Sequence, residues 1–159
     1  MLSTISKPED RPPILTICGD AGTGKTSLAA TFPSPIFIRA EDGLQSIPQA
    51  QRPDAFPVLK DSETLFEQLL ALLKEDHDYS TLVIDSVSKL VSEILETDRR
   101  AKRINQALGG YGNGPSAVAA MHGRVRKAAG MLNEKKHMAV VFIAHADLET
   151  MRPPDMDDY

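Results

Sequence analysis

A glycine-rich segment at residues 19–26 carries the clearest chemistry in this chain. It reads Gly-Asp-Ala-Gly-Thr-Gly-Lys-Thr and matches the pattern G-x-x-x-x-G-K-[ST] at every fixed position. In this pattern the glycines let main-chain N–H groups point at phosphates, the lysine reaches the β- and γ-phosphates, and the last hydroxyl binds Mg²⁺. We therefore expect this loop to bind the phosphates of a nucleotide. The expected contacts come from Gly19, Asp20, Ala21, Gly22, Thr23, Gly24, Lys25, Thr26 and Ser27.

The residues on either side of the loop support this interpretation. Residues 14–18 are an apolar, β-branched run, which predicts a buried strand. Residues 26–32 predict a helix that Pro33 ends. A strand, a glycine loop and a helix N-terminus in this order place partial positive charge where phosphate would bind.

Asp85 is the second candidate, because it ends the apolar run at residues 81–84. In NTPases with this kind of loop, a strand-ending acid binds Mg²⁺ beside the hydroxyl of the loop, here Thr26. The alternative role is to cap the helix that follows, which Ser86 could equally do. We expect Thr26 and Asp85 to form the Mg²⁺ site.

Glu41 follows the predicted strand at residues 36–38, at the edge of a parallel sheet where ligands bind. A carboxylate at this edge could orient and deprotonate an attacking water. Asp42 is the rival for this role, and an exposed loop acid without a catalytic role is the alternative. From spacing alone the choice stays open.

His145 follows the apolar run at residues 138–144 and should lie along the same edge as Asp85. It could sense a γ-phosphate by hydrogen bonding and pass that state to the loop after it. For a single histidine, a polar residue that merely ends a strand is the commoner case.

The remaining pattern alternates strands with helices. Helices are expected at about 62–73, with Ser62 as N-cap, at about 86–108 and at about 116–133. Residues 56–59 would add a short strand, limited to the edge of the sheet by Pro57, and residues 109–115 a glycine-rich loop. This order predicts an α/β fold with a mostly parallel sheet covered on both faces.

Composition and charge exclude several classes of protein. With 159 residues, 42% hydrophobic and 25% charged, the chain is typical of one globular domain, and it has no apolar stretch long enough for a membrane span. Cys18, the only cysteine, lies in a strand expected to be buried, so an inert core thiol in a reducing cytoplasm is expected. Four histidines and one cysteine show no zinc spacing.

Positive charge is concentrated in one segment. Residues 97–137 hold nine Lys or Arg and two acidic residues, a net charge of +7, whereas the rest of the chain carries −11. Such a segment can mark an anionic partner such as nucleic acid, although a solvated helix face is the commoner explanation of a charge run.

We divide the chain into a flexible lead-in at residues 1–13 and one domain at residues 14–159. Sheets of this kind usually continue beyond four or five strands, so this domain is expected to be incomplete. A natural end in a disordered tail at residues 147–159 is the alternative.

Taken together, these motifs resemble a known family. Residues 82–90 look like the second nucleotide motif of bacterial RecA-type recombinases, and residues 36–41 look like the strand that carries their catalytic glutamate. Residues 140–145 occupy the place of their sensor strand, with His145 where glutamine is usual. The glycine loop at residues 110–114 and the Ala144-His145 ending are similar to phage-type AAA ATP-binding proteins with a RecA/Rad51-like core, the Sak4-like single-strand annealing group.

The resemblance implies a RecA-like P-loop ATPase that uses ATP and Mg²⁺ in phage or prophage DNA recombination. Lys25, Glu41 and His145 would be its catalytic residues, with Glu41 as the base and His145 as the sensor. It also implies a homo-oligomer in the cytoplasm, with no membrane partner. Single-stranded DNA would contact residues 109–115 and 146–157, but neither loop is strongly basic, and the basic run at 99–103 is the alternative contact.

Other functions stay open at this stage. A small-molecule kinase shares the glycine loop, and residues 99–103 could imitate its lid. An ATP-dependent assembly switch without DNA binding is the third interpretation. A GTPase is disfavoured because the chain has no Asn-Lys-x-Asp motif. Arg124 and Arg126 are candidates for an arginine finger on charge alone.

Overall fold

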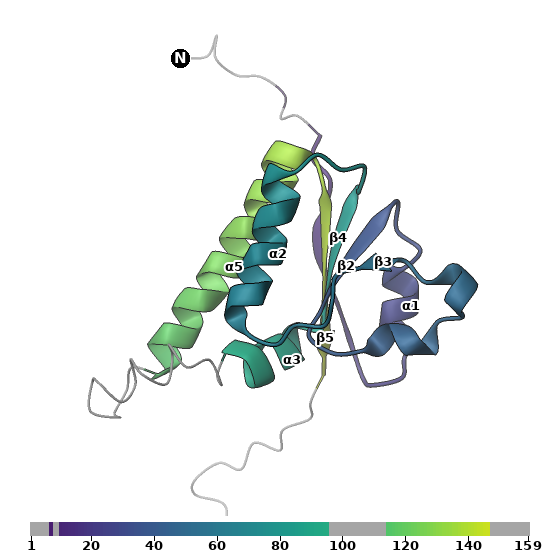
Figure 1. The fold of residues 1–159 in the computed structure, drawn as a ribbon, viewed down its shortest axis with the longest axis horizontal. Coiled ribbons are helices and arrows are strands. Elements are labelled where there is room, and N and C mark those ends of the chain that lie inside the picture. Colours follow the sequence, from purple (N-terminus) through teal and green to yellow (C-terminus); the bar gives the residue numbers. More distant parts are fainter. Residues whose placement is uncertain (1–6, 8–9, 96–113, 147–159) are drawn as a thin grey trace, which may run out of the picture.

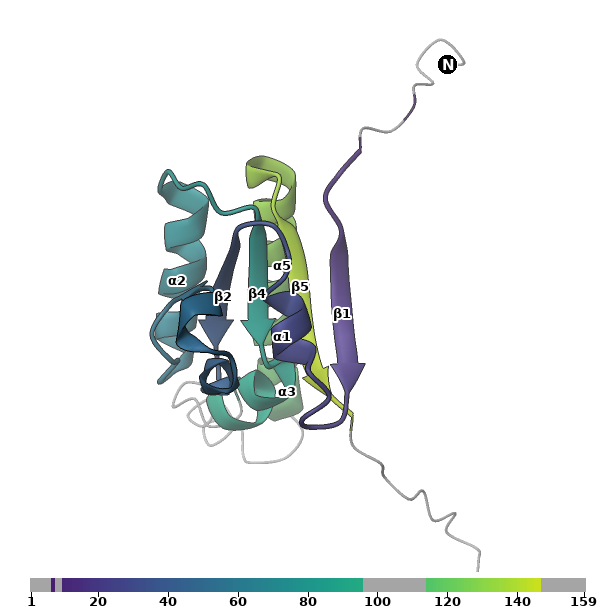
Figure 2. The ribbon, with the colours of Figure 1, turned by 90° about the vertical axis from the view of Figure 1, so that its right-hand side faces the viewer.

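Within residues 7, 10–95 and 114–146, which the computed structural model describes, five strands form one parallel sheet. The strands are β1 (Ile14–Gly19), β2 (Pro35–Arg39), β3 (Asp54–Ala55), β4 (Thr81–Asp85) and β5 (Ala139–His145). Their order across the sheet is β1-β5-β4-β2-β3, and all four pairings are parallel. All carboxyl ends therefore lie at one edge of the sheet (Figure 2).

Helices cover both faces of this sheet (Figure 1). One face carries α1 (Lys25–Ala29) with the 3₁₀ turns η2 (Gly43–Ser46) and η3 (Gln49–Gln51). The other face carries α2 (Ser62–Lys74) and α5 (Gly114–Lys136), which pack against each other. After β4, the short α3 (Val87–Lys89) continues into the π-helix η4 (Leu90–Leu95).

Alternation along the central strands separates two apolar cores. On β4, Leu82 and Ile84 face α2 and α5, whereas Val83 faces α1, as expected for a strand whose side chains alternate between faces. The five residues of β4 are all buried, because the strand lies between β5 and β2 under helices on both sides. This buried strand holds the Asp85 carboxylate at the edge of the sheet.

The predicted fold class is confirmed. The structure is a three-layer α/β sandwich with a parallel sheet, consistent with a P-loop NTPase of the RecA-like kind. β5 lies between the glycine-loop strand β1 and the acid-bearing strand β4, so these two strands are neighbours of β5 rather than of each other.

Residues 14–18 form a strand as predicted, but the prediction that this strand is buried is wrong. β1 lies at the edge of the sheet, where only Leu15 and Ile17 pack against the core on the α1 side. The other face of β1 is exposed, including Ile14, and Cys18 is an exposed thiol rather than a core thiol.

Several element bounds also differ from expectation. The N-cap of α2 is Asp61, whose carboxylate accepts a hydrogen bond from the Thr64 N–H at 2.8 Å, and Ser62 is the first helical residue. The expected strand at 56–59 lies at β3, two residues earlier, at the sheet edge as expected. The first helix, α1, ends at Ala29 and is therefore shorter than the helix expected at residues 26–32.

The glycine-rich loop ends earlier than expected, because Gly114 and Pro115 already belong to α5. Proline is tolerated in the first turn of a helix, where its missing N–H would have no helical partner. The rest of that loop and residues 96–108 of the preceding predicted helix lie outside the described residues. In the part of the chain described here, no helix has both the length and the apolar character needed to cross a membrane.

Candidate nucleotide site

The glycine loop joins the end of β1 to the start of α1. Gly22 and Gly24 have φ values of +78° and +83°, which other residues adopt only with strain. The Thr23 hydroxyl donates a hydrogen bond to the Asp20 carbonyl at 2.8 Å and closes the turn. The backbone thus requires glycine at both positions, of which Gly24 is fixed in the motif and Gly22 is not.

Lys25 lies inside this loop and is only 7% exposed. Its Nζ donates hydrogen bonds to the main-chain carbonyls of Gly19 at 2.8 Å and Asp20 at 2.6 Å. The ammonium group is therefore held among backbone groups rather than paired with a carboxylate. A phosphate bound in the loop could therefore interact directly with the positive charge of Lys25.

Thr26 and Asp85 meet at the base of the loop, although they are 59 residues apart in the sequence. The Thr26 hydroxyl donates to Asp85 Oδ2 at 2.8 Å. Hydroxyl and carboxylate oxygens are the hard ligands that Mg²⁺ prefers, and this ion usually takes only one or two protein ligands beside water and phosphate. The donor set therefore fits Mg²⁺.

Gly43 closes the other side of this pair and was not predicted from the sequence. A Cβ on Gly43 would lie 3.1 Å from Asp85 Oδ2 and 3.5 Å from Thr26 Oγ1. A side chain here would compete for the space beside both oxygens. The only signal in the sequence was the position of this glycine just after the end of a strand.

Burial raises the pKa of the Asp85 carboxyl above its ordinary value of 3.8. The hydrogen bond from Thr26 opposes this rise, and the negative charge of Glu41 adds to it. The folded protein thus binds a proton at Asp85 more tightly than the unfolded chain does. The contribution of Asp85 to stability must then fall as the pH rises above 3.8 through the raised pKa.

Replacing Asp85 by asparagine should therefore stabilise the ligand-free protein at pH 7. We expect an increase in Tm of about 2–4 °C, which corresponds to ~1 kcal/mol in a domain of this size. Calorimetry with and without Mg–ATP measures both effects, because the same variant should lose the stabilisation that Mg–ATP gives. A lower Tm in the ligand-free variant would contradict the argument from burial.

Glu41 and His145 also come together, although they are 104 residues apart. His145 Nε2 lies 2.9 Å from Glu41 Oε1, and both side chains are about 30% exposed or less. Burial alone would raise the pKa of Glu41, but hydrogen bonds from His145 and Ser86 and the nearby charge of Lys89 lower it below its ordinary 4.5. Glu41 is consequently a carboxylate at neutral pH.

Asp42, the other candidate for the base, forms hydrogen bonds with neighbouring side chains instead of with His145. Its Oδ1 accepts a hydrogen bond from Arg39 at 2.8 Å and its Oδ2 one from Gln45 at 3.0 Å. Both oxygens thus stabilise the turn after β2. The geometry favours Glu41 over Asp42 as a base, a choice that spacing had left open.

These groups line one open cavity of about 510 Å³ at the carboxyl edge of the sheet. Strand register explains why they meet, since Gly19 pairs with His145 and Ile143 pairs with Asp85. The cavity combines the glycine loop with the Thr26–Asp85 pair and the Glu41–His145 pair. The cavity therefore contains the groups expected to bind a nucleoside triphosphate.

The match to known families agrees with this geometry. A sequence profile of the AAA domain matches residues 11–159. The chain belongs to the AAA domain family. A search of curated proteins found no match to this chain. Family membership agrees with the P-loop NTPase fold and indicates ATP binding, while the roles of individual residues in this AAA domain stay predictions.

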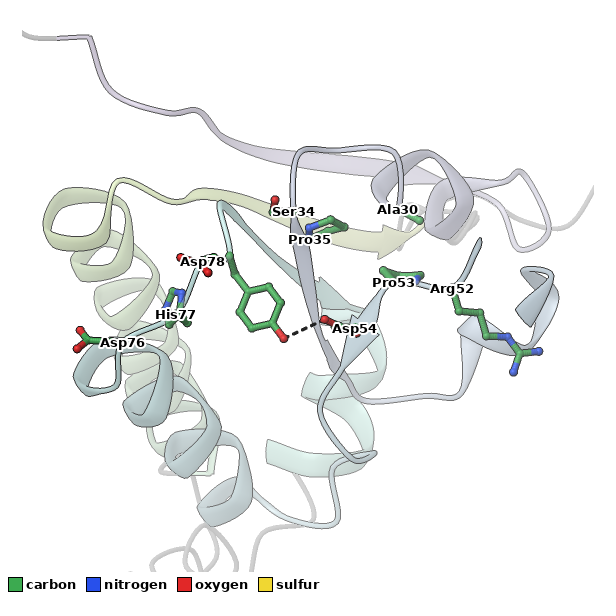
Figure 3. A pocket seen from close by; sticks show the side chains of 10 residues that line it. Ala30, Ser34, Pro35, Arg52, Pro53, Asp54, Asp76, His77 and Asp78 are labelled. Carbon is green, nitrogen blue, oxygen red and sulfur yellow. Dashed lines mark hydrogen bonds between the residues drawn. The ribbon is translucent and has the colours of Figure 1, made fainter. Parts of the chain in front are cut away.

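A larger cavity of about 740 Å³ lies away from the glycine loop of the AAA domain (Figure 3). Its charged lining is mostly acidic, with Asp54, Asp76 and Asp78, and Arg52 lies on the opposite side from Asp76 and Asp78 (Figure 3). The Asp54 carboxylate already accepts a hydrogen bond from the Tyr79 hydroxyl at 3.0 Å. Carboxylates would repel phosphates, so size alone does not make this cavity the nucleotide site.

Proposed function

We propose that this AAA domain binds and hydrolyses Mg–ATP at the carboxyl edge of its sheet. The observation that carries the proposal is the Glu41–His145 hydrogen bond in the same cavity as the Thr26–Asp85 pair and Lys25. A glycine loop alone would serve any phosphate ligand. A carboxylate positioned beside it adds the means to activate water.

Each group has a distinct role in this proposal. Lys25 binds the β- and γ-phosphates, and Thr26 and Asp85 hold Mg²⁺, which supplies positive charge that offsets the charge on the phosphates. Glu41 orients the attacking water and accepts its proton. His145 donates to Glu41 in the present structure and would donate to a γ-phosphate when one is bound, leaving the Glu41 carboxylate free for water.

The biological process that we propose is DNA recombination or single-strand annealing in a phage or prophage, in the cytoplasm of the host. Support comes from the ordered resemblance of residues 36–41, 82–90 and 140–145 to RecA-type proteins. The expected DNA loops lie almost entirely outside the described residues. A homo-oligomer with ATP between subunits belongs to the same proposal.

The two arginine-finger candidates differ in their surroundings. The Arg124 guanidinium lies over the ring of Phe66, 4.0 Å from its centroid, so it already has a partner within the chain. Arg126 is exposed and lines a groove between α5 and β1. Arg126 is therefore the better candidate for contact with a neighbouring subunit or an anionic ligand.

Nucleotide turnover with and without single-stranded DNA tests the proposal. We expect ATP hydrolysis that rises severalfold with single-stranded DNA at low salt and loses this response as salt increases, because phosphate contacts weaken with ionic strength. Equal hydrolysis with and without DNA, together with no retardation of DNA at low salt, would contradict the DNA role. Transfer of phosphate to a metabolite rather than to water would indicate the kinase, and ATP binding without turnover the assembly switch.

A further inference from the structure

Ser88 makes a contact to the candidate sensor that none of the roles above uses. It lies in α3, just after the acid-bearing strand β4. Its Oγ accepts a hydrogen bond from the main-chain N–H of His145 at 3.0 Å. A side chain of one segment thus fixes the backbone of another, 57 residues away.

Strand geometry shows why this contact is needed. Every second N–H of β5 faces β4, beginning with the Ala139 N–H that donates to the Ser80 carbonyl at 2.9 Å. By this alternation the His145 N–H also faces the β4 side, but β4 ends at Asp85, opposite Ile143. His145 therefore extends two residues beyond its neighbouring strand.

The main-chain acceptor that a longer β4 would present at this point is already used by the helix that follows. The Ser86 carbonyl, which a longer strand would present to His145, accepts a hydrogen bond from the Leu90 N–H at 2.9 Å as the helix begins. The Ser88 hydroxyl takes its place and continues the ladder by one bond. Without it, the backbone N–H of a partly buried residue would lack this partner.

We propose that Ser88 is a positioning residue, which holds the end of β5 so that the His145 imidazole reaches Glu41. The imidazole bond to Glu41 is 2.9 Å long, and it requires the main chain of His145 to stay where Ser88 holds it. This inference rests on the proposed function, because it concerns how the sensor and the base are aligned. It also links α3 to the nucleotide site, so a displacement of α3 would move the sensor.

A second contact on the same side strengthens the argument. The Ser86 side chain contributes to lowering the pKa of Glu41, and its Oγ accepts a hydrogen bond from the Lys89 N–H at 3.3 Å. The short segment from Ser86 to Ser88 therefore places one hydroxyl near the base and bonds the sensor backbone with another.

The test compares Ser88→Ala with Ser88→Thr, which keeps the hydroxyl, and with Ser92→Ala as a matched control. Ser92 is an exposed serine four residues further on, and its hydroxyl bonds to the Ser88 carbonyl at 3.1 Å rather than to a residue of β5. The readouts are kcat and KM for ATP, amide hydrogen exchange at His145, and the ¹⁵N shifts of its imidazole. The last two do not depend on hydrolysis.

We expect Ser88→Ala to lower kcat about two- to tenfold, the range for one lost hydrogen bond, with KM for ATP unchanged and Tm lowered by only about 2–4 °C. The His145 amide should exchange faster and the imidazole shifts should move, whereas Ser88→Thr and Ser92→Ala should resemble the wild type. Unchanged His145 signals in Ser88→Ala, or an equal loss of Tm in Ser88→Ala and Ser92→Ala, would overturn the proposal. Absence of hydrolysis in the wild type would contradict the proposed function, and the two NMR readouts would still decide the role of Ser88.

Discussion

Replacing Lys25 by alanine should weaken ATP binding by about 100-fold or more and abolish turnover, because the charge-assisted hydrogen bonds that we propose for Lys25 to phosphate would be lost. Among the residues that line the cavity, Lys25 brings the one lysine or arginine side chain. Its Nζ is held within the loop by the Gly19 and Asp20 carbonyls, so the charge is placed before any ligand arrives. Titration with a fluorescent ATP analogue measures the loss of binding.

Lys60→Ala is the matched control for this experiment. Lys60 is exposed and does not line the cavity, so its removal takes the same charge from the protein without touching the loop. Circular dichroism should show that both variants fold, because α1 is a short element and the loop lies at the surface. Equal affinity for ATP in Lys25→Ala and the wild type would exclude the glycine loop as the phosphate site.

Local sequence signals predicted the parts of this site that depend on a few adjacent residues. The glycine loop was recognisable because Gly19, Gly24, Lys25 and Thr26 fill the fixed positions of a short motif between a strand and a helix. Asp85 and His145 were recognisable because long apolar runs end at these residues. Such runs bury strands and leave the next polar residue at the sheet edge.

These local signals did not predict how segments that are distant in the sequence are arranged in space. Sequence alone did not place β1 at the sheet edge, so Cys18 was wrongly expected in the core. The contact of Gly43 with the Thr26–Asp85 pair depends on how the turn after β2 crosses the edge of the sheet. These features follow from the strand order, which the spacing of motifs along the chain does not contain.

Local sequence signals also could not distinguish Glu41 from Asp42 as the candidate base. Both acids follow β2, and their types and positions in the sequence are nearly equivalent. The structure separates them, because Arg39 and Gln45 occupy both oxygens of Asp42 while Glu41 contacts His145. A partner 104 residues away therefore distinguishes the candidate base from its neighbour.

Replacing Glu41 by glutamine should lower the rate of ATP hydrolysis by about 10²–10⁴-fold, the contribution of a positioned general base. ATP affinity should stay within about threefold of the wild type, because the proposed phosphate and metal contacts come from Lys25, Thr26 and Asp85 rather than from Glu41. Glutamine keeps the size of the side chain and an oxygen for the bond to His145, but it cannot accept a proton at neutral pH. Single-turnover kinetics and nucleotide titration separate the two effects.

Asp42→Asn is the control that makes this prediction specific. It removes a negative charge from the adjacent residue, whose oxygens already bond to Arg39 and Gln45, so turnover should fall only a few-fold. A larger loss in Asp42→Asn than in Glu41→Gln would assign the base to Asp42. If Glu41→Gln and Lys25→Ala lost ATP binding equally, Glu41 would act in binding rather than as the base, and the glycine loop would still stand as the phosphate site.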